Sequence, residues 1–276
     1  MIELPEAVTL ARQINANLTG CVVRAVIAGA SPHKFAWYHG DPIGYAALLE
    51  GCTLLQSAAH GGIVEIQLTR ASLTFSDGVN LRLHRQGDPI PAKHQLLLTF
   101  EDGSALSASV QMYGGLICWA AGDVYDNSYY LVAKEKPSPL DTALFTEAYF
   151  IQLLASPEVQ KLGAKAALAT EQRIPGLGNG VLQDVLWHAR LSPRRKVDGL
   201  SIEETHNLFT ALKRTLAEMT HLGGRDTEKD LFGQPGGYLT IMSAKNAGAP
   251  CPGCGRPIRK EPYLGGSVYY CAQCQP

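Results

Sequence analysis

The chain has 276 residues, of which 46% are hydrophobic and 18% are charged. This length allows one large core, or two smaller cores and a small module. No apolar run is long enough to cross a bilayer, and no basic stretch followed by an apolar one opens the chain. We therefore expect neither a membrane span nor a signal peptide, and the sequence predicts a cytoplasmic protein without a membrane partner.

The net charge of −1 by itself argues against a nucleic-acid binder. The charge is unevenly distributed, however. From Arg190 to the C-terminus there are 12 Lys or Arg against 8 Asp or Glu, whereas the preceding part has 12 against 17. A negatively charged partner would therefore prefer the C-terminal part of the chain.

The first predicted element is a helix. Apolar residues recur at helical spacing over residues 7–20, and Gly20 provides a stop signal. Pro5 fits the first turn, because the N–H that proline lacks has no partner there. Glu3 and Glu6 flank this proline. They either only stabilise the helix N-terminus or also belong to an active site.

Residues 20–119 have the pattern of short β-strands. Asp77-Gly78 and Asp102-Gly103 each lie between alternating apolar and polar stretches, which predicts two β-hairpins. Several such strands in this length indicate a β-sandwich or barrel. Three cysteines stand singly in apolar surroundings that predict small buried side chains: Cys21, Cys52 and Cys118.

Residues 134–139 contain two prolines and mixed charge and predict a linker. The pattern beyond is helical. Ser201 and Glu204 have the spacing of a capping box, and a Gly-Gly pair ends a helix whose apolar face comprises Leu208, Leu212, Leu216 and Met219. We therefore expect an α+β multidomain protein, with a β-sandwich domain over 1–133, a helical domain over 134–245 and a small module over 246–276.

The small module contains two Cys-x2-Cys pairs separated by sixteen residues, namely Cys251, Cys254, Cys271 and Cys274. Two such turns facing each other supply the four thiolates of a structural zinc site, and the intervening segment has the pattern of a zinc-ribbon hairpin. Disulfides are the alternative, which a cytoplasmic location disfavours. Three basic residues suit a DNA backbone or are simply a solvated surface: Arg256, Arg259 and Lys260.

A glycine-rich turn at residues 176–179, Gly-Leu-Gly-Asn, separates two apolar helical stretches. The flanking pattern predicts a helix–turn–helix and not a dinucleotide fingerprint, which needs a strand before the turn. Backbone N–H groups at the start of the second helix, with the amide of Asn179, suit a phosphate. An ordinary connection between helices has the same pattern.

Glu-Leu-Pro-Glu near the N-terminus, Gly-Leu-Gly-Asn in a helix–turn–helix, GGR…GGY and the terminal cysteine pairs occur in one order. This combination resembles the formamidopyrimidine-DNA glycosylase/endonuclease VIII family of base-excision repair enzymes, over nearly the whole chain. The resemblance implies a β-sandwich flanked by helices, a helix–two-turn–helix domain and a zinc finger. It also implies a monomer, associated with the nucleoid, that binds damaged duplex DNA in the cleft between domains.

In that family the mature chain begins with a proline whose amine attacks the sugar and forms a Schiff base, and the next residue is a glutamate that handles protons. Glu3 matches the glutamate, but Ile2 stands in place of the proline. Isoleucine carries no nucleophilic group, and its bulk opposes removal of Met1. The resemblance therefore implies a weak or absent lyase step.

Other family positions differ as well. The loop that carries the family's catalytic lysine corresponds to residues 58–62, where only His60 is titratable. The family's zinc-finger arginine corresponds to Gly266 or Ser267. The residues that fill the space left by an extruded base correspond to Arg85, Gln111 and Tyr113.

Two further positions keep the family's chemistry. Asn179 matches the asparagine that binds the phosphate beside the lesion, and Asp184 provides a carboxylate where the family has glutamate. Residues 223–239 correspond to a mobile loop over the base, or form an ordinary surface connection.

Three functions remain open at this point. The first, which we favour, is a DNA glycosylase in which Glu3 activates water or protonates the sugar without a Schiff base. The second is a non-catalytic binder of damaged or distorted DNA. In the third, the α-amine of Met1 folds back and replaces the proline amine. The sequence does not predict which lesion is recognised.

Overall fold

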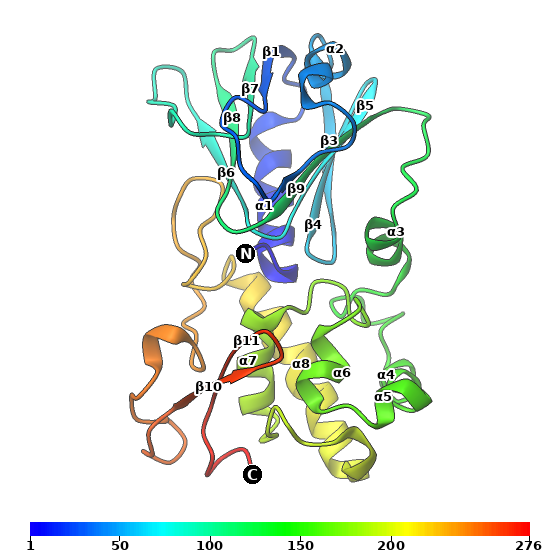
Figure 1. Cartoon of the computed structure of the whole chain (residues 1–276), viewed down its shortest axis with the longest axis vertical. Helices are drawn as coiled ribbons and strands as arrows, with labels where there is room; N and C mark the ends of the chain where they lie inside the picture. The colour runs from blue at the N-terminus through cyan, green and yellow to red at the C-terminus, as the bar shows by residue number, and fades with distance from the viewer.

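Helix α1 (Leu4–Leu18) opens the fold: its N-terminal end lies at the junction of an upper and a lower lobe, and the helix runs from there into the upper lobe (Figure 1). The structure is a computed structural model that describes residues 1–276. Pro5 lies in the first turn of α1 and Gly20, with a φ of +86°, follows its end, as predicted. Leu10 packs in the core of the upper lobe, whereas Leu4 belongs to the core of the lower lobe. The first helix therefore joins the two lobes.

Two β-sheets form the upper lobe and enclose its core. Their strand orders are β1-β7-β8-β6 and β2-β9-β5-β4-β3, and only the β2–β9 pair is parallel. A short 3-10 turn, η1 (Pro42–Gly44), and helix α2 (Tyr45–Leu49) follow β2. The strands are β1 (Val23–Ala28), β2 (Ala36–Trp37), β3 (Leu54–His60), β4 (Ile63–Leu68), β5 (Ala71–Ser76), β6 (Val79–His84), β7 (Leu96–Phe100), β8 (Ala105–Val110) and β9 (Gly114–Ala120).

One of the two predicted hairpins is confirmed, because β7 and β8 pair across Asp102-Gly103. The prediction at Asp77-Gly78 is wrong. The flanking strands lie in different sheets, since β5 pairs with β4 and β9 whereas β6 pairs with β8. Asp77 has a left-handed φ of +59°, and this turn carries the chain from one sheet to the other.

Two of the three isolated cysteines are buried as predicted, namely Cys52 and Cys118. The prediction for Cys21 is wrong, because this residue is half-exposed just after the end of α1. Its Sγ lies 3.9 Å from a carboxylate oxygen of Asp102, in the β7–β8 turn. Cys21 thus packs at the edge of the upper-lobe core, next to this polar turn.

The lower lobe is helical. No helix of the chain is both long and apolar enough to cross a membrane. The predicted linker is shorter than expected, since its first two residues are the last two of α3. Helix α3 (Ser128–Glu135) packs on the upper lobe, where Tyr130 and Ala133 form a cluster with Ile63 and Trp119. The helices and 3-10 turns of the lower lobe are α4 (Glu147–Leu154), α5 (Pro157–Gln160), α6 (Ala164–Ala169), α7 (Asn179–His188), η2 (Val197–Gly199) and α8 (Ile202–His221).

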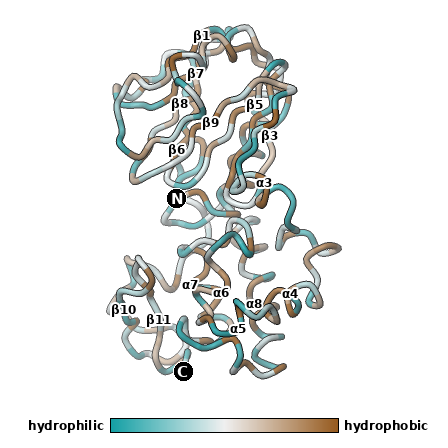
Figure 2. Tube along the Cα trace, turned by 45° about the vertical axis from the view of Figure 1, so that its right-hand side comes forward, coloured by the Kyte–Doolittle hydropathy of each residue, from teal (hydrophilic) through white to brown (hydrophobic).

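Helix α8 confirms the predicted capping box: Ser201 Oγ accepts from the amide of Glu204, whose carboxylate accepts from the amide of Ser201. Hydrophobic and hydrophilic residues alternate along this helix (Figure 2), and the predicted apolar face is buried. This face packs against α7, which fixes the position of the glycine-rich turn that precedes α7.

The C-terminal module is a two-stranded hairpin of β10 (Arg259–Tyr263) and β11 (Gly266–Tyr270), preceded by a 3-10 turn, η3 (Ala244–Asn246). Leu264 and Gly265 both have positive φ in the turn. Asp184 on α7 joins this module to the lower lobe. Its buried carboxylate accepts from the amides of Ile241 and Met242, at 2.9 and 2.6 Å.

Candidate functional site in the cleft between the lobes

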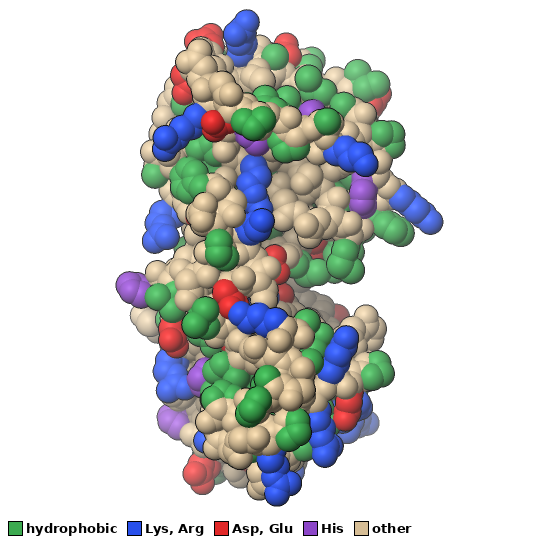
Figure 3. Space-filling view, turned by 90° about the vertical axis from the view of Figure 1, so that its left-hand side faces the viewer, with side chains coloured by type: hydrophobic (Ala, Val, Ile, Leu, Met, Phe, Trp, Pro, Cys, Tyr) green, Lys and Arg blue, Asp and Glu red, His purple; other side chains and the backbone are tan.

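A pocket of about 310 Å³ lies where the two lobes meet, and the space-filling view shows a notch between the lobes (Figure 3). The upper lobe contributes Met1, Ile2 and Tyr113, and the lower lobe contributes Gln172 and Asn179. No Lys or Arg lines this pocket, whereas three carboxylates do, those of Glu3, Asp77 and Glu171. A neutral sugar or base therefore suits this pocket better than a phosphate.

The chain end is fixed beside this pocket. Ile2 is buried in the core of the upper lobe, and its N–H donates to the carbonyl of Asp77 at 2.6 Å. The α-amine of Met1 forms an ion pair with Glu228, which belongs to the segment of residues 223–239. The amine is therefore already engaged with a carboxylate of this segment.

Glu3 caps α1 and reaches across to α7. Its Oε1 accepts from the amide of Gly180 at 2.9 Å, and its Oε2 accepts from the amide of Val181 at 2.8 Å. The first turn of a helix carries partial positive charge, so this position favours a carboxylate. The approach requires glycine, since a Cβ at Gly178 would lie 2.6 Å from the Glu3 carboxyl group.

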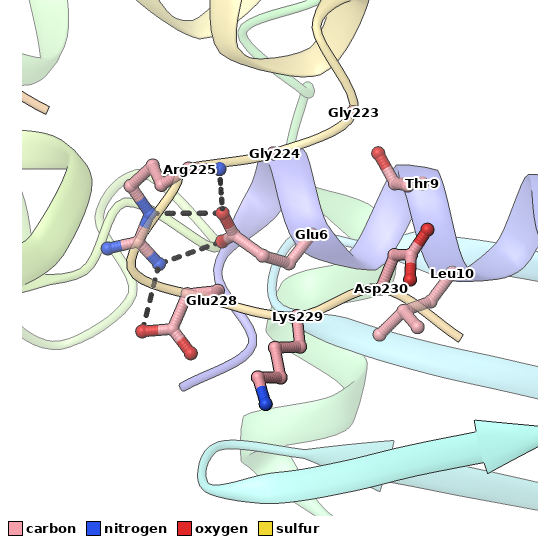
Figure 4. Close-up of a pocket in the computed structure, with 9 residues that line it drawn as sticks. All are labelled: Glu6, Thr9, Leu10, Gly223, Gly224, Arg225, Glu228, Lys229 and Asp230. Atoms are coloured by element: carbon pink, nitrogen blue, oxygen red, sulfur yellow. Dashed lines mark hydrogen bonds and ion pairs between the residues drawn. The ribbon is translucent and has the colours of Figure 1, made fainter. Parts of the chain in front are cut away.

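Arg225 is the centre of a buried ion cluster next to Glu3 (Figure 4). Its Nε and Nη2 donate to the two carboxylate oxygens of Glu6 at 3.0 and 2.8 Å. Its Nη1 lies 3.6 Å from Glu3, and its Nη2 lies 3.9 Å from Glu228. Two positive groups, the guanidinium and the α-amine of Met1, thus pair with three carboxylates, those of Glu3, Glu6 and Glu228.

The ionisation of Glu3 follows from this arrangement. Burial raises the pKa of Glu3 above its ordinary value, and the charge of Glu6 acts in the same direction. Arg225 and the two α7 amides oppose this shift only in part, because Arg225 makes its short contacts with Glu6. A carboxyl group with a raised pKa is suited to donating a proton at the pH of a cell.

Residues 223–239, predicted to form a loop over the base, are bonded to the upper lobe. The amide of Leu231 donates to Gln13 Oε1 at 2.9 Å, and Arg82 Nη1 donates to the carbonyl of Asp230 at 2.8 Å. The recess between this segment and α1, drawn in Figure 4, has no space for a water molecule. The segment therefore fills this side of the cleft.

The opposite side of the cleft is formed by the glycine-rich turn and the ribbon. Asn179 is exposed, and its Nδ2 donates to the carbonyl of Ser267 at 3.1 Å. Gln183 Nε2 donates to the same carbonyl. A Cβ at Gly266 would lie 3.9 Å from Asn179 Nδ2. The fold thus brings the ribbon tip to the glycine-rich turn, but the tip presents backbone and no basic side chain.

Lys165 on α6 was missed by the sequence analysis. It is 5% exposed, its Nζ donates to the carbonyl of Tyr263 at 2.8 Å, and burial lowers its pKa. Its Nζ lies 3.8 Å from the position of a Cβ at Gly266. The signal in the sequence is a single lysine within an apolar run, GAKAALA, which is unusual for a buried helix face.

His60 lies at the end of β3 but does not line the pocket. Its Nε2 is 2.8 Å from Glu65, which also accepts from Tyr130 at 3.1 Å and lies 3.8 Å from Lys134. Burial alone would raise the pKa of Glu65, but the hydrogen bond from His60 and the charge of Lys134 lower it. His60 is therefore paired within the upper lobe.

The tip of the β3–β4 hairpin contacts the lower lobe through glycine backbone alone. A Cβ at Gly61 would lie 2.6 Å from Cβ of Pro175, in the glycine-rich turn. The hairpin and the turn are packed so closely that the tip offers no long side chain to the cleft.

The other predicted DNA-contacting residues divide into two groups. Tyr113 lines the pocket, whereas Arg85 and Gln111 are exposed on the upper lobe and do not. The basic residues of the ribbon are all exposed to solvent: Arg256, Arg259 and Lys260.

The four cysteines of the module meet in one cluster, with their sulfur atoms within 4.8 Å of one another. Cys251 and Cys274 are 3.8 Å apart, and Cys254 and Cys271 are 3.4 Å apart, so none is disulfide-bonded. A tetrahedral ion with metal–sulfur bonds of about 2.3 Å requires sulfur–sulfur distances of about 3.8 Å. Trp187 Nε1 also donates to Cys251 Sγ at 3.4 Å, as partners of metal-bound thiolates do. The cluster therefore fits a four-coordinate metal ion.

Comparison with known proteins places this arrangement in context. No family model matches the chain. It is similar to formamidopyrimidine-DNA glycosylase of Thermus thermophilus, with 29% identity over 288 residues that cover 100% of this chain and 98% of the relative. The enzyme of the same name from Acidiphilium cryptum is 28% identical, with both chains fully covered.

Solved structures agree with these relatives. The crystal structure of the MutM (Fpg) protein of Thermus thermophilus matches with a TM-score of 0.81 and 28% identity, over 99% of this chain and 98% of that one. The fold also matches the Lactococcus lactis Fpg in complex with DNA containing an abasic site, with a TM-score of 0.82, 23% identity and 99% of each chain covered. In both sequence and fold, the chain is thus similar to formamidopyrimidine-DNA glycosylases over its full length.

Proposed function

We propose that this protein binds damaged duplex DNA in the cleft between its lobes and releases a base by hydrolysis, with Glu3 as the acid/base group. The observation that carries the proposal is the Glu3 carboxyl group, which lines the cleft pocket and whose pKa is raised by burial. Support also comes from the Lactococcus lactis Fpg, which shares the fold and was solved with DNA containing an abasic site.

The reaction needs one proton donor and one water molecule. The bond between the base and the sugar C1′ breaks, and the bonding electron pair leaves with the base. Water adds to C1′ and loses one proton, and the departing base takes up one proton. Glu3 protonates the sugar to assist bond cleavage or takes the proton of the attacking water. The absence of Lys and Arg from the pocket leaves the sugar and base as the groups that fit it.

A lyase step through an amine is not part of the proposal. Ile2 is buried, the amine of Met1 is paired with Glu228, and no lysine lines the pocket. Borohydride trapping on duplexes with an oxidised base or an abasic site should therefore give no covalent product. A trapped band whose mass places the DNA on Met1 would instead establish the α-amine as a replacement nucleophile.

The four-cysteine cluster is proposed to hold one structural Zn²⁺. Four thiolates complete a tetrahedral shell, so the ion would have no open position for substrate and would stabilise the module. The module carries the exposed residues proposed to contact the DNA backbone: Arg256, Arg259 and Lys260.

A non-catalytic binder of damaged DNA is the second candidate. The observation that favours it is that both carboxylate oxygens of Glu3 already accept backbone hydrogen bonds. A base-release assay on a panel of lesions separates the two candidates, with wild type beside Glu3→Gln. Glu228→Gln is the matched control, because this carboxylate belongs to the same ion cluster but does not line the cleft pocket.

If the glycosylase proposal is correct, wild type and Glu228→Gln release a base and Glu3→Gln does not. Release by Glu3→Gln at the wild-type rate would contradict the role of Glu3. Tight binding of lesion DNA by the wild type, with no release of any base, would establish the binder.

A further inference from the structure

A second pocket, of about 520 Å³, opens on the upper lobe beside the cleft. It lies between β2, β9 and the segment that leads into α3. Asp77, Tyr113 and Tyr129 line both this pocket and the cleft pocket, so the two adjoin. Its volume is within the range of sites that bind small molecules.

The walls of this aromatic pocket are flat rings. The rings of Trp37 and Tyr113 are 5.6 Å apart at 36°. Tyr125 forms a further wall and is itself fixed by stacking on Trp119, at 4.8 Å and 19°. The side chains of Trp37 and Tyr129 are 48% and 45% exposed, although large aromatic side chains are usually covered.

Among the polar side chains that line the aromatic pocket, Asp77 offers an acceptor and Asn127 offers a donor. Asp77 Oδ2 accepts from Ser76 Oγ at 2.8 Å, and a carboxylate has acceptor capacity for further bonds. Asn127 caps α3, with its Oδ1 accepting from the amide of Tyr130 at 3.1 Å. The Nδ2 of Asn127 donates to no group of the protein and is available to a ligand.

We propose that the aromatic pocket receives an unpaired nucleobase of the DNA bound in the cleft. The inference rests on the proposed DNA binding and adds a site for one base. The exposed rings of Trp37 and Tyr129 provide stacking surfaces, which every base can use. Asp77 accepts from an exocyclic amino group, and Asn127 donates to a neighbouring ring nitrogen or carbonyl. Cytosine and adenine present this combination on their Watson–Crick edges.

The position of the aromatic pocket favours a base over other flat or cationic ligands. Aromatic side chains with a carboxylate also suit a quaternary ammonium group. The aromatic pocket shares three residues with the cleft pocket, however, so it lies directly beside the proposed position of the DNA.

Fluorescence anisotropy with two duplexes of equal length tests the proposal, one fully paired and one with a single bulged cytosine. The wild type is expected to bind the bulged duplex about 10-fold more tightly, since stacking of one base contributes about 1–3 kcal/mol. Trp37→Ala should lose this preference and keep the wild-type affinity for paired DNA, because Trp37 lines the aromatic pocket and not the cleft pocket. Phe35→Ala is the matched control, because Phe35 is also 48% exposed, two residues from Trp37, but does not line the pocket.

Asp77→Asn tests the recognition of the base edge. The left-handed backbone at Asp77 accepts asparagine, so the fold is expected to persist. Because an amide oxygen is a weaker acceptor than a carboxylate, and the amide NH₂ can face the exocyclic amino group as a second donor, this variant should weaken the preference for a bulged cytosine. An unchanged preference would overturn the role of Asp77.

The outcomes separate this inference from the proposed function. Equal affinity of the wild type for both duplexes, or a preference that Trp37→Ala retains, overturns the base site and leaves DNA binding intact. Failure of the wild type to bind either duplex overturns both. Competition for the aromatic pocket by a trimethyllysine peptide, but not by cytidine, overturns the base site in favour of a cation site.

Discussion

The two sides of the cleft are held together by different interactions. Around Glu3 the protein is dense, and buried ion pairs join α1, α7 and residues 223–239. On the other side, Asn179 and the basic residues of the ribbon are exposed, and the ribbon depends on four cysteines. The first side holds the groups proposed for chemistry, and the second holds those proposed to bind the DNA backbone. The two functions should therefore be separable by substitution.

Loss of the metal should have the largest effect, and on the ribbon side alone. A four-thiolate zinc site contributes on the order of 10–16 kcal/mol to folding of its module, so Cys271→Ser should unfold the ribbon and remove most of the DNA affinity. Zinc content, circular dichroism and anisotropy measure this. Cys52→Ser is the control, since that cysteine is buried in the upper lobe. Unchanged DNA binding by a metal-free variant would contradict the proposed role of the ribbon.

Arg225→Met should have the next largest effect, on the other side. It leaves the buried carboxylates of Glu3 and Glu6 without their guanidinium, which costs about 3–5 kcal/mol of unfolding free energy. Urea unfolding measures the loss. Lys229→Ala, an exposed cation of the same segment, should stay within about 0.5 kcal/mol of wild type. Equal midpoints for Arg225→Met and wild type would mean that the ion cluster does not hold the two lobes together.

The third prediction concerns the side around Glu3 and the pH dependence of its stability. The pKa of Glu3 is raised in the folded state, so folding takes up a proton between the ordinary value of 4.5 and the folded value. The contribution of this proton to the free energy of unfolding is complete below pH 4.5, and it is lost as pH rises through the pKa of Glu3 in the folded state. Wild type should therefore lose up to about 1.4 kcal/mol per pH unit in this window, and Glu3→Gln should lose less.

Urea unfolding at a series of pH values measures this difference. Glu228→Gln removes a carboxylate from the same cluster and serves as the control, with the wild-type slope expected. Equal slopes in wild type and Glu3→Gln would show that Glu3 is ionised throughout the window and cannot serve as an acid.

The smallest expected effect concerns one cation of the ribbon. Arg259→Ala should lower DNA affinity a few-fold and reduce the slope of log affinity against log salt by about 0.9, the value for one phosphate contact. Arg24→Ala, an exposed arginine on β1, should leave the slope unchanged. A salt slope that neither substitution changes would place the DNA backbone elsewhere on the protein.

The sequence predicted the features that depend on local spacing. Pro5 and the capping box of Ser201 and Glu204 mark helix starts through neighbours in the chain. The prediction from the two Cys-x2-Cys pairs required only that the two pairs meet, and binding of one metal ion by all four thiolates explains why they do. In each case the physical cause lies within a few residues, or in a ligand with strict geometric demands.

The features that the sequence did not predict depend on contacts between distant segments. Asp77-Gly78 has the local signal of a hairpin, but β5 and β6 pair with strands of two different sheets and not with each other. Arg225 meets Glu3 and Glu6 across more than 200 residues, and nothing in its neighbourhood indicates burial. His60 was expected to face DNA, but Glu65 provides a closer partner.

The burial of Ile2 opposes a proline at this position, which the family resemblance would lead one to expect. A proline in its place would lack the N–H that bonds to the carbonyl of Asp77, and it would become the terminal amine only after loss of Met1 and its ion pair with Glu228. Even then, Gly61 packs too closely on Pro175 for the neighbouring hairpin to accept a lysine at that position. Each of these family residues is thus excluded by contacts that the present residues make. Ile2→Pro and Gly61→Lys are therefore both expected to lower the stability of this chain.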